Sequence, residues 1–419
     1  MKPPVVPADA GPATFRPVAW AAGLTLAGWA AVAIWPQMLL TLGIANYGKT
    51  YLDSYAVLAA VDAVRAGLDP HVDIPLDVLH RPHVYSDWWL ALRWLGLGRE
   101  HNFLVGTAWV GAFGLTVLGA ARLRNLGEAL WLAALLVSPS LLLVINRANN
   151  DLVIFVLLTG CGLAAALTTW WRGAVAVACL WLATGLKYFP ATTVLAFLWV
   201  RPVRRMPAML LAGLLAVVLA LASVWDQIDR SRFLIGSGLY AMGAPILWRD
   251  WGWPDKESFL PGFLLVVGAA ILLVWGRITT GLATRGQPRE RLLAASGGVV
   301  LLACFLAGMN FGYRWVFALW PALWLWRRAA EGMMPARQSW AARIACGLVF
   351  ACLWMDGCFC ATINLFFLYH TPAWEAHMKL LWRIWTQPLH WLLMMMLAGW
   401  LLEGALATMK EWWELRHEN

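Results

Sequence analysis

Residues 206–225 read MPAMLLAGLLAVVLALASVW, and none of these twenty residues carries a charge. A helix needs about twenty apolar residues to cross a hydrocarbon core about 30 Å thick. The basic stretch RPVRR at 201–205 precedes the segment, and arginines of this kind mark loops kept on the cytoplasmic side. The stretch therefore predicts a transmembrane helix that starts at the cytoplasmic surface.

Similar apolar runs recur along all 419 residues, of which 61% are hydrophobic and only 13% charged. A soluble domain carries roughly a quarter charged residues, so this composition predicts an all-α polytopic membrane protein with about ten spans. Many of the thirty Trp stand at span ends, as expected at a membrane–water interface. The predicted spans are 17–44, 102–121, 128–145, 151–170, 206–225, 259–276, 292–309, 312–326, 344–369 and 387–408.

The net charge of +9 is spread over short basic clusters between the spans rather than gathered in one patch. This pattern indicates loops retained in the cytoplasm and argues against a nucleic-acid partner. We expect a multi-pass protein of the cell membrane, the inner membrane in a bacterium, with both termini cytoplasmic. The predicted parts are a tail at 1–16, a single transmembrane domain at 17–408 with outer loops near 45–101, 226–258 and 370–386, and a tail at 409–419.

Residues 173–200 form an apolar segment with arginines assigned to the cytoplasm at both ends. The conflict disappears if the chain turns near Lys187–Pro190 and returns as a short helical hairpin, with arms of about thirteen residues that cannot cross alone. Pro190 favours a break because proline lacks a backbone donor. Broken backbone at membrane depth needs a polar or protein environment, so Lys187 would lie in a polar pocket. A continuous kinked helix is the alternative.

The first outer loop differs from the rest of the chain. Residues 46–101 hold seven of the 23 acidic residues and four of the eight His. Apolar residues at helical spacing between Asp53 and Gly67 predict an amphipathic helix on the outer surface of the membrane. Asp53, the first residue of this helix, is either a simple helix cap or a functional carboxylate.

Three histidines of this loop, His71, His80 and His83, stand near Asp73 and Asp77. The spacing His-x2-His lacks the second ligand pair of a structural zinc site, so solvated loop histidines are the favoured interpretation and no metal is predicted. The chain also has no P-loop or dinucleotide-binding fingerprint in a plausible context. We therefore predict no cofactor, and a donor other than a cytosolic nucleotide if the protein is an enzyme.

Polar residues at membrane level are costly, which makes each one a candidate for function. Four sets stand out: the stretch NRANND at 146–151, Lys187, the stretch NFGYR at 310–314, and Asp356. The predicted topology brings the first three to the outer face beside the first loop. Asp356 lies in the middle of a span, and both a structural and a functional role stay open for it.

These segments resemble glycosyltransferase family 87, the polyprenol-phosphate-mannose-dependent branch of the GT-C superfamily of integral membrane glycosyltransferases. Asp53 is similar to the acidic residue that follows the first span in this family. The later stretch Gly67-Leu-Asp-Pro-His71 is similar to the family's Gly-x-Asp-Pro-Tyr, with His71 in place of Tyr. Three further family segments have similar stretches in this chain. They are RANND at 147–151, GLKYFP at 185–190, and NFGYR at 310–314 with Pro321 downstream. The region after about 340 has no matching motif.

The resemblance implies a GT-C-like bundle that transfers a hexose such as mannose, with inversion, from a polyprenyl-phosphate donor to a lipid or glycan acceptor at the outer face. Such a reaction needs a carboxylate to take the acceptor's proton and fixed cations to hold the phosphate. The implied roles are catalysis by Asp53 or Asp151, phosphate binding by Lys187, Arg314 and Arg147, and sugar binding by Asn149, Asn150, Asn310 and Tyr313.

A transporter or flippase of a lipid-linked or polar substrate is the competing interpretation, because transporters also contain broken helices and intramembrane charge. The C-terminal half holds no second copy of the Asp53 helix or of the Lys187 hairpin. An acidic outer loop also suits a site on one face better than alternating access. A non-catalytic membrane scaffold is a third possibility.

Overall fold

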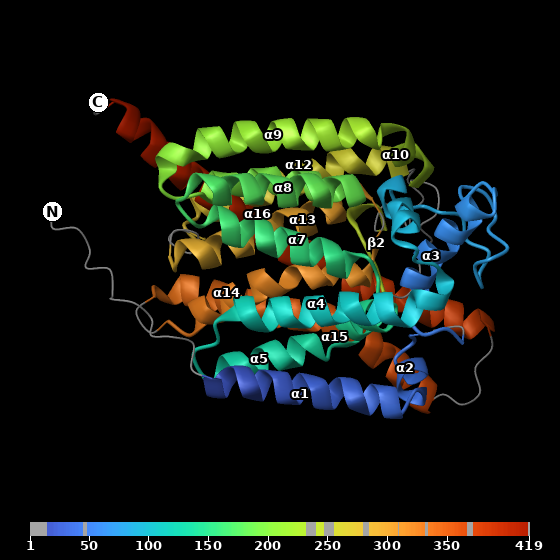
Figure 1. The fold of residues 1–419 in the computed structure, drawn as a ribbon. Coiled ribbons are helices and arrows are strands. Elements are labelled where there is room, and N and C mark those ends of the chain that lie inside the picture. Colours follow the sequence, from blue (N-terminus) through green and yellow to red (C-terminus); the bar gives the residue numbers. More distant parts are fainter. Residues whose placement is uncertain are drawn as a thin grey trace.

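The chain is built almost entirely of helices that run roughly parallel to one another (Figure 1). The computed structural model describes residues 15–44, 48–231, 240–246, 255–279, 285–308, 310–331, 334–366 and 372–417. Within these residues the only strands are β1 (Ala241–Met242) and β2 (Asn310–Phe311), which pair antiparallel. Parts of several predicted segments lie outside the described residues. They include residues 1–14 of the N-terminal tail, residues 45–47 of the first outer loop, and residues 232–239 and 247–254 of the second outer loop.

Six helices among the described residues are long and apolar enough to cross a bilayer. The number rises to seven if the pair α5 (Leu126–Leu136) and α6 (Pro139–Asn146), bent by 59° where Pro139 interrupts the helix, is counted as one broken span. The six are α1 (Phe15–Ile34), α4 (Asn102–Ala121), α9 (Met206–Ser223), α13 (Pro288–Ala307), α15 (Ala336–Phe366) and α16 (Pro372–His417). The prediction of an all-α polytopic membrane protein is confirmed.

Several predicted spans correspond to shorter elements. The predicted span 151–170 is α7 (Asp151–Ala165), and 312–326 divides into the 3-10 helix η5 (Gly312–Ala318) and α14 (Leu319–Ala329). The predicted ten or so spans therefore outnumber those that qualify by length among the described residues. The other elements are α2 (Gln37–Thr41), α3 (Leu52–Arg65), η1 (Asp87–Leu95), η2 (Arg99–His101), α8 (Trp170–Leu186), η3 (Phe189–Trp199), η4 (Val203–Arg205), α10 (Trp225–Ser231) and α12 (Asp255–Trp275).

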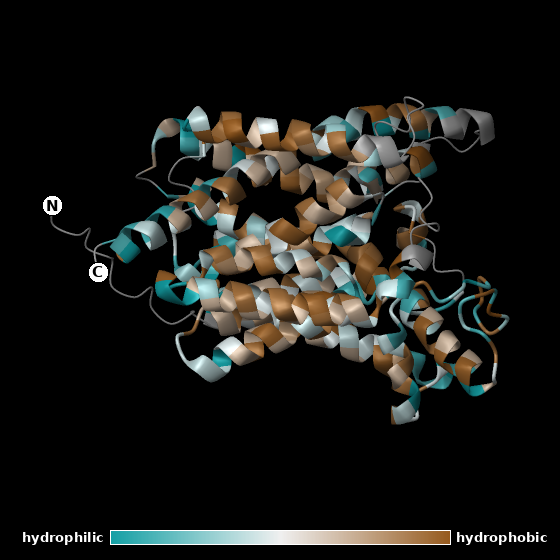
Figure 2. Ribbon diagram, turned by 90° about the horizontal axis from the view of Figure 1, so that it is seen from above, coloured by the Kyte–Doolittle hydropathy of each residue, from teal (hydrophilic) through white to brown (hydrophobic). Residues whose placement is uncertain are grey.

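The outward faces of the bundle are apolar, as contact with lipid requires. Helix α9 buries Gly213 and Ala216 against its neighbours but leaves the side chain of Leu211 72% exposed. Figure 2 shows hydrophobic residues along the bodies of the helices and many hydrophilic ones at the two ends. Exposed leucines on a packed helix are explained by a hydrocarbon environment rather than by water.

The chain turns back at Lys187, where the sequence predicts a hairpin. Helix α8 ends at Leu186, Lys187 is extended, and η3 then returns along α8. After the return, the Arg205 side chain donates a hydrogen bond to the carbonyl of Leu167, just before α8 begins. A continuous kinked helix is therefore wrong. The first arm is longer than the expected length of about thirteen residues, with seventeen residues of α-helix. The second arm has only eleven residues, but as a 3-10 helix it rises about 2.0 Å per residue and so covers more distance per residue than an α-helix.

The predicted helix of the first outer loop is α3, and it lies with η1 and η2 in a layer at one end of the bundle (Figure 1). Tyr51 occupies the N-cap position in a left-handed conformation, with no side-chain cap, so the interpretation of Asp53 as a helix cap is wrong. Gly67, at a φ of +74°, ends the helix as predicted. The buried side chains of α3 pack against Ile74 and Leu90 of the same layer instead of lying on lipid.

Helix α16 differs from the prediction at its start. The sequence predicts an outer loop at 370–386, but the helix begins at Pro372 and continues unbroken to His417. The first turn of α1 and the last turn of α16 lie at the same end of the bundle, opposite to α3 (Figure 1). The layer around α3 is therefore separated from both ends of the described chain by the length of the bundle.

Close packing of Tyr51 on α4 sets the start of α3. A Cβ atom at Gly106 would collide with the Tyr51 ring, whereas one at Gly111 of the same helix would meet nothing within 4 Å. We expect Gly106→Val to lower the unfolding temperature of the purified protein, at a cost of about 1–3 kcal/mol. Gly111→Val carries the same change in helix propensity and serves as the control. Equal shifts for the two variants would contradict this account of Tyr51.

Candidate functional site

A cavity of about 330 Å³ opens at the end of the bundle that carries α3. Five segments form it: α3, the loop 81–86, the end of α6, the turn between α8 and η3, and the β2–η5 segment, with the α9–α10 corner closing one side. The two-residue ladder between β1 and β2 ties residues 241–242 to the start of the β2–η5 segment. Segments far apart in the sequence therefore meet around one space.

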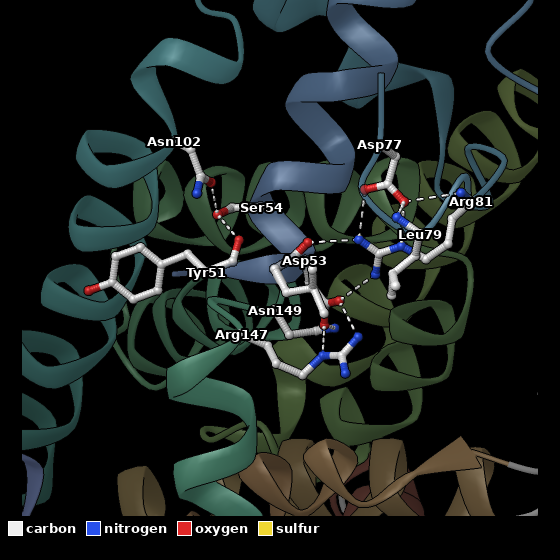
Figure 3. A network of polar contacts seen from close by, with 10 residues as sticks. Tyr51, Asp53, Ser54, Asp77, Leu79, Arg81, Asn102, Arg147 and Asn149 are labelled. Atoms are coloured by element: carbon white, nitrogen blue, oxygen red, sulfur yellow. Dashed lines mark hydrogen bonds and ion pairs between the residues drawn. The ribbon is translucent and has the colours of Figure 1, made fainter. Parts of the chain in front are cut away.

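Asp53 lies at the centre of one polar network (Figure 3). Its side chain is only 3% exposed. Arg147 donates to it twice, from Nε to Oδ2 at 2.9 Å and from Nη2 to Oδ1 at 2.7 Å. Asn149 Nδ2 donates to Oδ2 at 2.7 Å, and Arg81 Nη1 donates to Oδ1 at 3.2 Å. Burial alone raises the pKa of Asp53, but Arg147, Asn149 and Arg81 together hold this pKa below its ordinary value, so the carboxylate is ionised.

Arg81 also lines the cavity, although the sequence does not single it out. Its Nε and Nη2 donate to the two oxygens of Asp77 at 2.8 and 3.0 Å, and Nη2 also donates to the carbonyl of Leu52 at 2.9 Å. Asp77 is buried, and Arg81 holds the pKa of Asp77 below its ordinary value although burial raises it. The opposite charges at positions i and i+4 are the only signal, and they carry little weight in an irregular loop.

A second network centres on Asp151, the first residue of α7. Its fully buried carboxylate accepts hydrogen bonds from Lys187 Nζ and from Nη1 of Arg314. Asn310 supports Arg314 by accepting from its Nε at 3.2 Å. Lys187 and Arg314 line the cavity, whereas Asp151 lies behind them. Since a general base must be within reach of its substrate, this placement favours Asp53 over Asp151 and makes Asp151 the group that positions the two cations.

Of the four residues expected to bind sugar, Tyr313 alone lines the cavity. Asn149 donates to Asp53 and accepts from the backbone N–H of Asp151 at 3.0 Å. The amide of Asn310 donates to two backbone carbonyls. Asn150 is buried and its side chain has no hydrogen-bond partner among the described residues. Asn149 and Asn310 are therefore supports for the charged groups.

Aromatic side chains surround the two cations. Lys187 Nζ lies 5.2 Å from the ring centre of Tyr85, and Cζ of Arg314 lies 4.1 Å from the ring centre of Phe189. Rings at such distances attract cations through their negative faces. Gln227 lies in the same cavity, and its Oε1 accepts from the backbone N–H of Asp87 at 3.0 Å. Nothing in the sequence singles out Tyr85 and Gln227, whose residue types are unremarkable in polar loops.

The other candidates of the sequence analysis lie outside the cavity. His80 is exposed as expected, but His83 is buried and its Nε2 contacts the carbonyl of Ser86 at 3.2 Å, so the expectation of a solvated ring is wrong there. In the part of the chain that the structure describes, no group of three or more His, Cys, Asp or Glu is arranged to hold a metal ion. Asp356 accepts a hydrogen bond from Trp382 Nε1 at 3.0 Å, which favours the structural role.

The two networks leave the cavity with an excess of positive charge. Arg81, Arg147, Lys187 and Arg314 carry four positive charges, and Asp53, Asp77 and Asp151 carry three negative ones. Guanidinium and ammonium groups around a partly apolar cavity suit an anionic group such as a phosphate. Among the described residues, Asp53 is the one carboxylate that lines the cavity, and it can accept a proton from a hydroxyl once it has a free acceptor position.

No protein-family model matches this chain, and searches of characterised proteins and of solved structures also found no match. The function proposed below therefore rests on the cavity itself.

Removal of the Asp151 charge would leave Lys187 and Arg314 buried together without their shared partner. We expect Asp151→Asn to destabilise the protein by about 3–5 kcal/mol, which thermal unfolding of the purified protein measures. The double variant Asp151→Asn/Arg314→Met should recover part of this loss because it removes one unpaired cation.

Asp62→Asn is the matched control, because Asp62 forms a more exposed pair with Arg99 in the layer around α3. Such pairs contribute about 0–1 kcal/mol. Equal destabilisation by Asp151→Asn and Asp62→Asn would contradict a central role for Asp151.

Proposed function

We propose that this protein is a GT-C-like glycosyltransferase that moves a hexose such as mannose from a polyprenyl-phosphate donor to a lipid or glycan acceptor at the outer face of the membrane. One observation carries the proposal. A single cavity at one end of a membrane-embedded bundle unites the carboxylate of Asp53 with the cations Arg147, Lys187 and Arg314.

The three cations suit the phosphate of a lipid-linked donor. Negative charge grows on that phosphate as the bond to the sugar breaks, and fixed cations in a water-poor cavity stabilise such charge. Arg147 and Arg314 offer planar forks for bidentate contact with phosphate, and Lys187 adds a point charge. Asp151 keeps Lys187 and Arg314 in place before the donor enters.

Asp53 is the proposed base. In the reaction, the acceptor oxygen forms a bond to the anomeric carbon while the bond from that carbon to the phosphate oxygen breaks. The hydroxyl proton passes to Asp53, and the polyprenyl phosphate leaves with the electron pair. Attack opposite the leaving phosphate inverts the configuration at the anomeric carbon.

The remaining walls of the cavity suit the rest of the donor. Tyr313 and Gln227 supply polar groups for sugar hydroxyls. Val84, Val224 and Ile228 form an apolar side near the α9–α10 corner, where the first isoprene units of the carrier would lie. A donor held by its lipid and its phosphate needs no nucleotide site.

A transporter of a lipid-linked substrate is the alternative. Two broken helical segments, α5–α6 and α8–η3, favour it, because transporters bind substrates at such breaks. Against it, the cavity lies at one end of the bundle beside α3, whereas transport requires access from both sides.

The test is sugar transfer by the purified protein in vesicles that contain a short-chain polyprenyl-phosphate hexose, with glycolipid products followed by mass spectrometry. We expect Asp53→Asn to lower turnover by at least about 100-fold, since it removes the base. Lys187→Met and Arg314→Met should raise the donor concentration needed for half-maximal rate.

Asp62→Asn, on the same helix as Asp53 but paired with Arg99, should retain wild-type turnover. Near wild-type turnover of a correctly inserted Asp53→Asn protein would remove Asp53 from the base role. Movement of the lipid between leaflets without any new glycosidic bond would support the transporter instead.

A further inference from the structure

All acceptor positions of Asp53 are occupied. A carboxylate has two lone-pair positions on each oxygen, about four in total. Oδ1 accepts from Arg147 and Arg81, and Oδ2 accepts from Arg147 and Asn149. A carboxylate filled in this way has no position left for the proton of an incoming hydroxyl. At least one donor must therefore move before Asp53 can act as a base.

Two of the three donor residues are anchored by other groups. The Arg81 side chain makes two hydrogen bonds to Asp77 and one to the carbonyl of Leu52. Its hydrogen bond to Asp53, at 3.2 Å, is longer than these three. Asn149 is held at its other end, where its Oδ1 accepts from the backbone N–H of Asp151. Both side chains keep their positions if other contacts to Asp53 change.

Arg147 is held differently. Both of its side-chain hydrogen bonds in the described part of the chain go to Asp53, and its side chain lines the cavity with 21% of its surface exposed. An anion that enters the cavity therefore competes with Asp53 for this guanidinium group. If Arg147 turns toward the anion, Asp53 gains two free acceptor positions and is still oriented by Arg81 and Asn149.

We propose that the phosphate of the lipid-linked substrate draws Arg147 away from Asp53, and that this step uncovers the base only when the donor is bound. The inference rests on the proposed function and adds an order of events to it. Phosphate binding comes first, and acceptance of the acceptor's proton follows. An empty cavity keeps Asp53 saturated and unreactive.

The change should appear as proton uptake. Arg147 makes the largest contribution to lowering the pKa of Asp53, which burial alone would raise. Loss of Arg147 and arrival of a negative phosphate therefore both raise this pKa, so the bound state holds more protons than the free state and affinity increases as the pH falls. Burial keeps the nearby Tyr85 phenol neutral by raising its pKa. In the described part of the chain, the charged or titratable groups that face Asp53 are Arg81, Tyr85, Arg147, Lys187 and Tyr313.

The experiment is calorimetric titration of the full-length protein in nanodiscs with farnesyl methyl phosphate. This phosphodiester carries one permanent negative charge and no sugar, so neither its own titration nor turnover interferes. Titrations in buffers of different ionisation enthalpy, between about pH 4 and 7, give the number of protons taken up. We expect the wild type to take up a fraction of a proton that grows toward the lower pH, up to one per probe, with tighter binding there. Near pH 7 Asp53 should stay ionised and able to act as the base.

The variants assign the proton to its group. Asp53→Asn should take up no proton and bind the probe several-fold more tightly, because Arg147 is no longer shared. Asp62→Asn, the matched change on the same helix, should behave as the wild type. If Asp53→Asn does not fold, Arg147→Met decides: it should bind more weakly and take up less proton than the wild type. Dimethyl phosphate, which lacks the lipid chain, should bind at least tenfold more weakly.

Each other outcome overturns a defined part of the account. Binding without proton uptake in the wild type, or uptake that persists in Asp53→Asn, rules out release of the base and leaves the donor site intact. Failure of the probe to bind overturns the phosphate site and with it the proposed function. Equal affinity for dimethyl phosphate would mean that the cavity takes a free phosphodiester rather than a lipid.

Discussion

Charges at the edge of an apolar helix bundle persist only in pairs, and two buried carboxylates satisfy this constraint here. Asp53 holds Arg147 and Arg81, while Asp151 holds Lys187 and Arg314. An unpaired buried charge costs several kcal/mol, so in the empty cavity each cation stays beside its carboxylate. The cavity is the space that these two networks share, and its excess of positive charge follows from four cations and three acids, with Asp77 as the third.

Interruptions of the helices bring these groups to one place. The turn at Lys187 ends α8 at the level of the cavity, and the bend before Pro139 directs α6 so that Arg147 lies under Asp53. The stretch 146–151, which connects α6 to α7, supplies side chains to both networks. Arg147 and Asn149 belong to the first, and Asp151 belongs to the second. A single short connection therefore couples the proposed base to the groups proposed to hold the phosphate.

Much of this arrangement is predictable, because ionisable residues are rare in apolar sequence and each one draws attention. That rarity predicts Arg147, Lys187 and Arg314 as site residues, and the arginines on both sides of 173–200 predict the turn at Lys187. Asp53 lies in an acidic loop, where a carboxylate is not rare, and its role is implied by the resemblance. Arg81 is not predictable, because a basic residue in a polar loop carries no penalty and its partner Asp53 lies 28 positions away. The sugar-binding role expected for the asparagines is not supported, because a sequence does not show which way a side chain points. Predicted span lengths are inaccurate where a 3-10 helix replaces an α-helix.

The central claim is that the cavity between Asp53, Arg147, Lys187 and Arg314 receives the phosphate of a lipid-linked sugar. The most direct measurement is an electron cryomicroscopy structure of the full-length protein in nanodiscs with an unreactive polyprenyl-phosphonate sugar. We expect phosphonate density in contact with Arg147 and Arg314, the sugar beside Tyr313, and Arg147 turned away from Asp53. Density for the analogue on a lipid-facing surface, with the Asp53–Arg147 pair intact, would contradict the account.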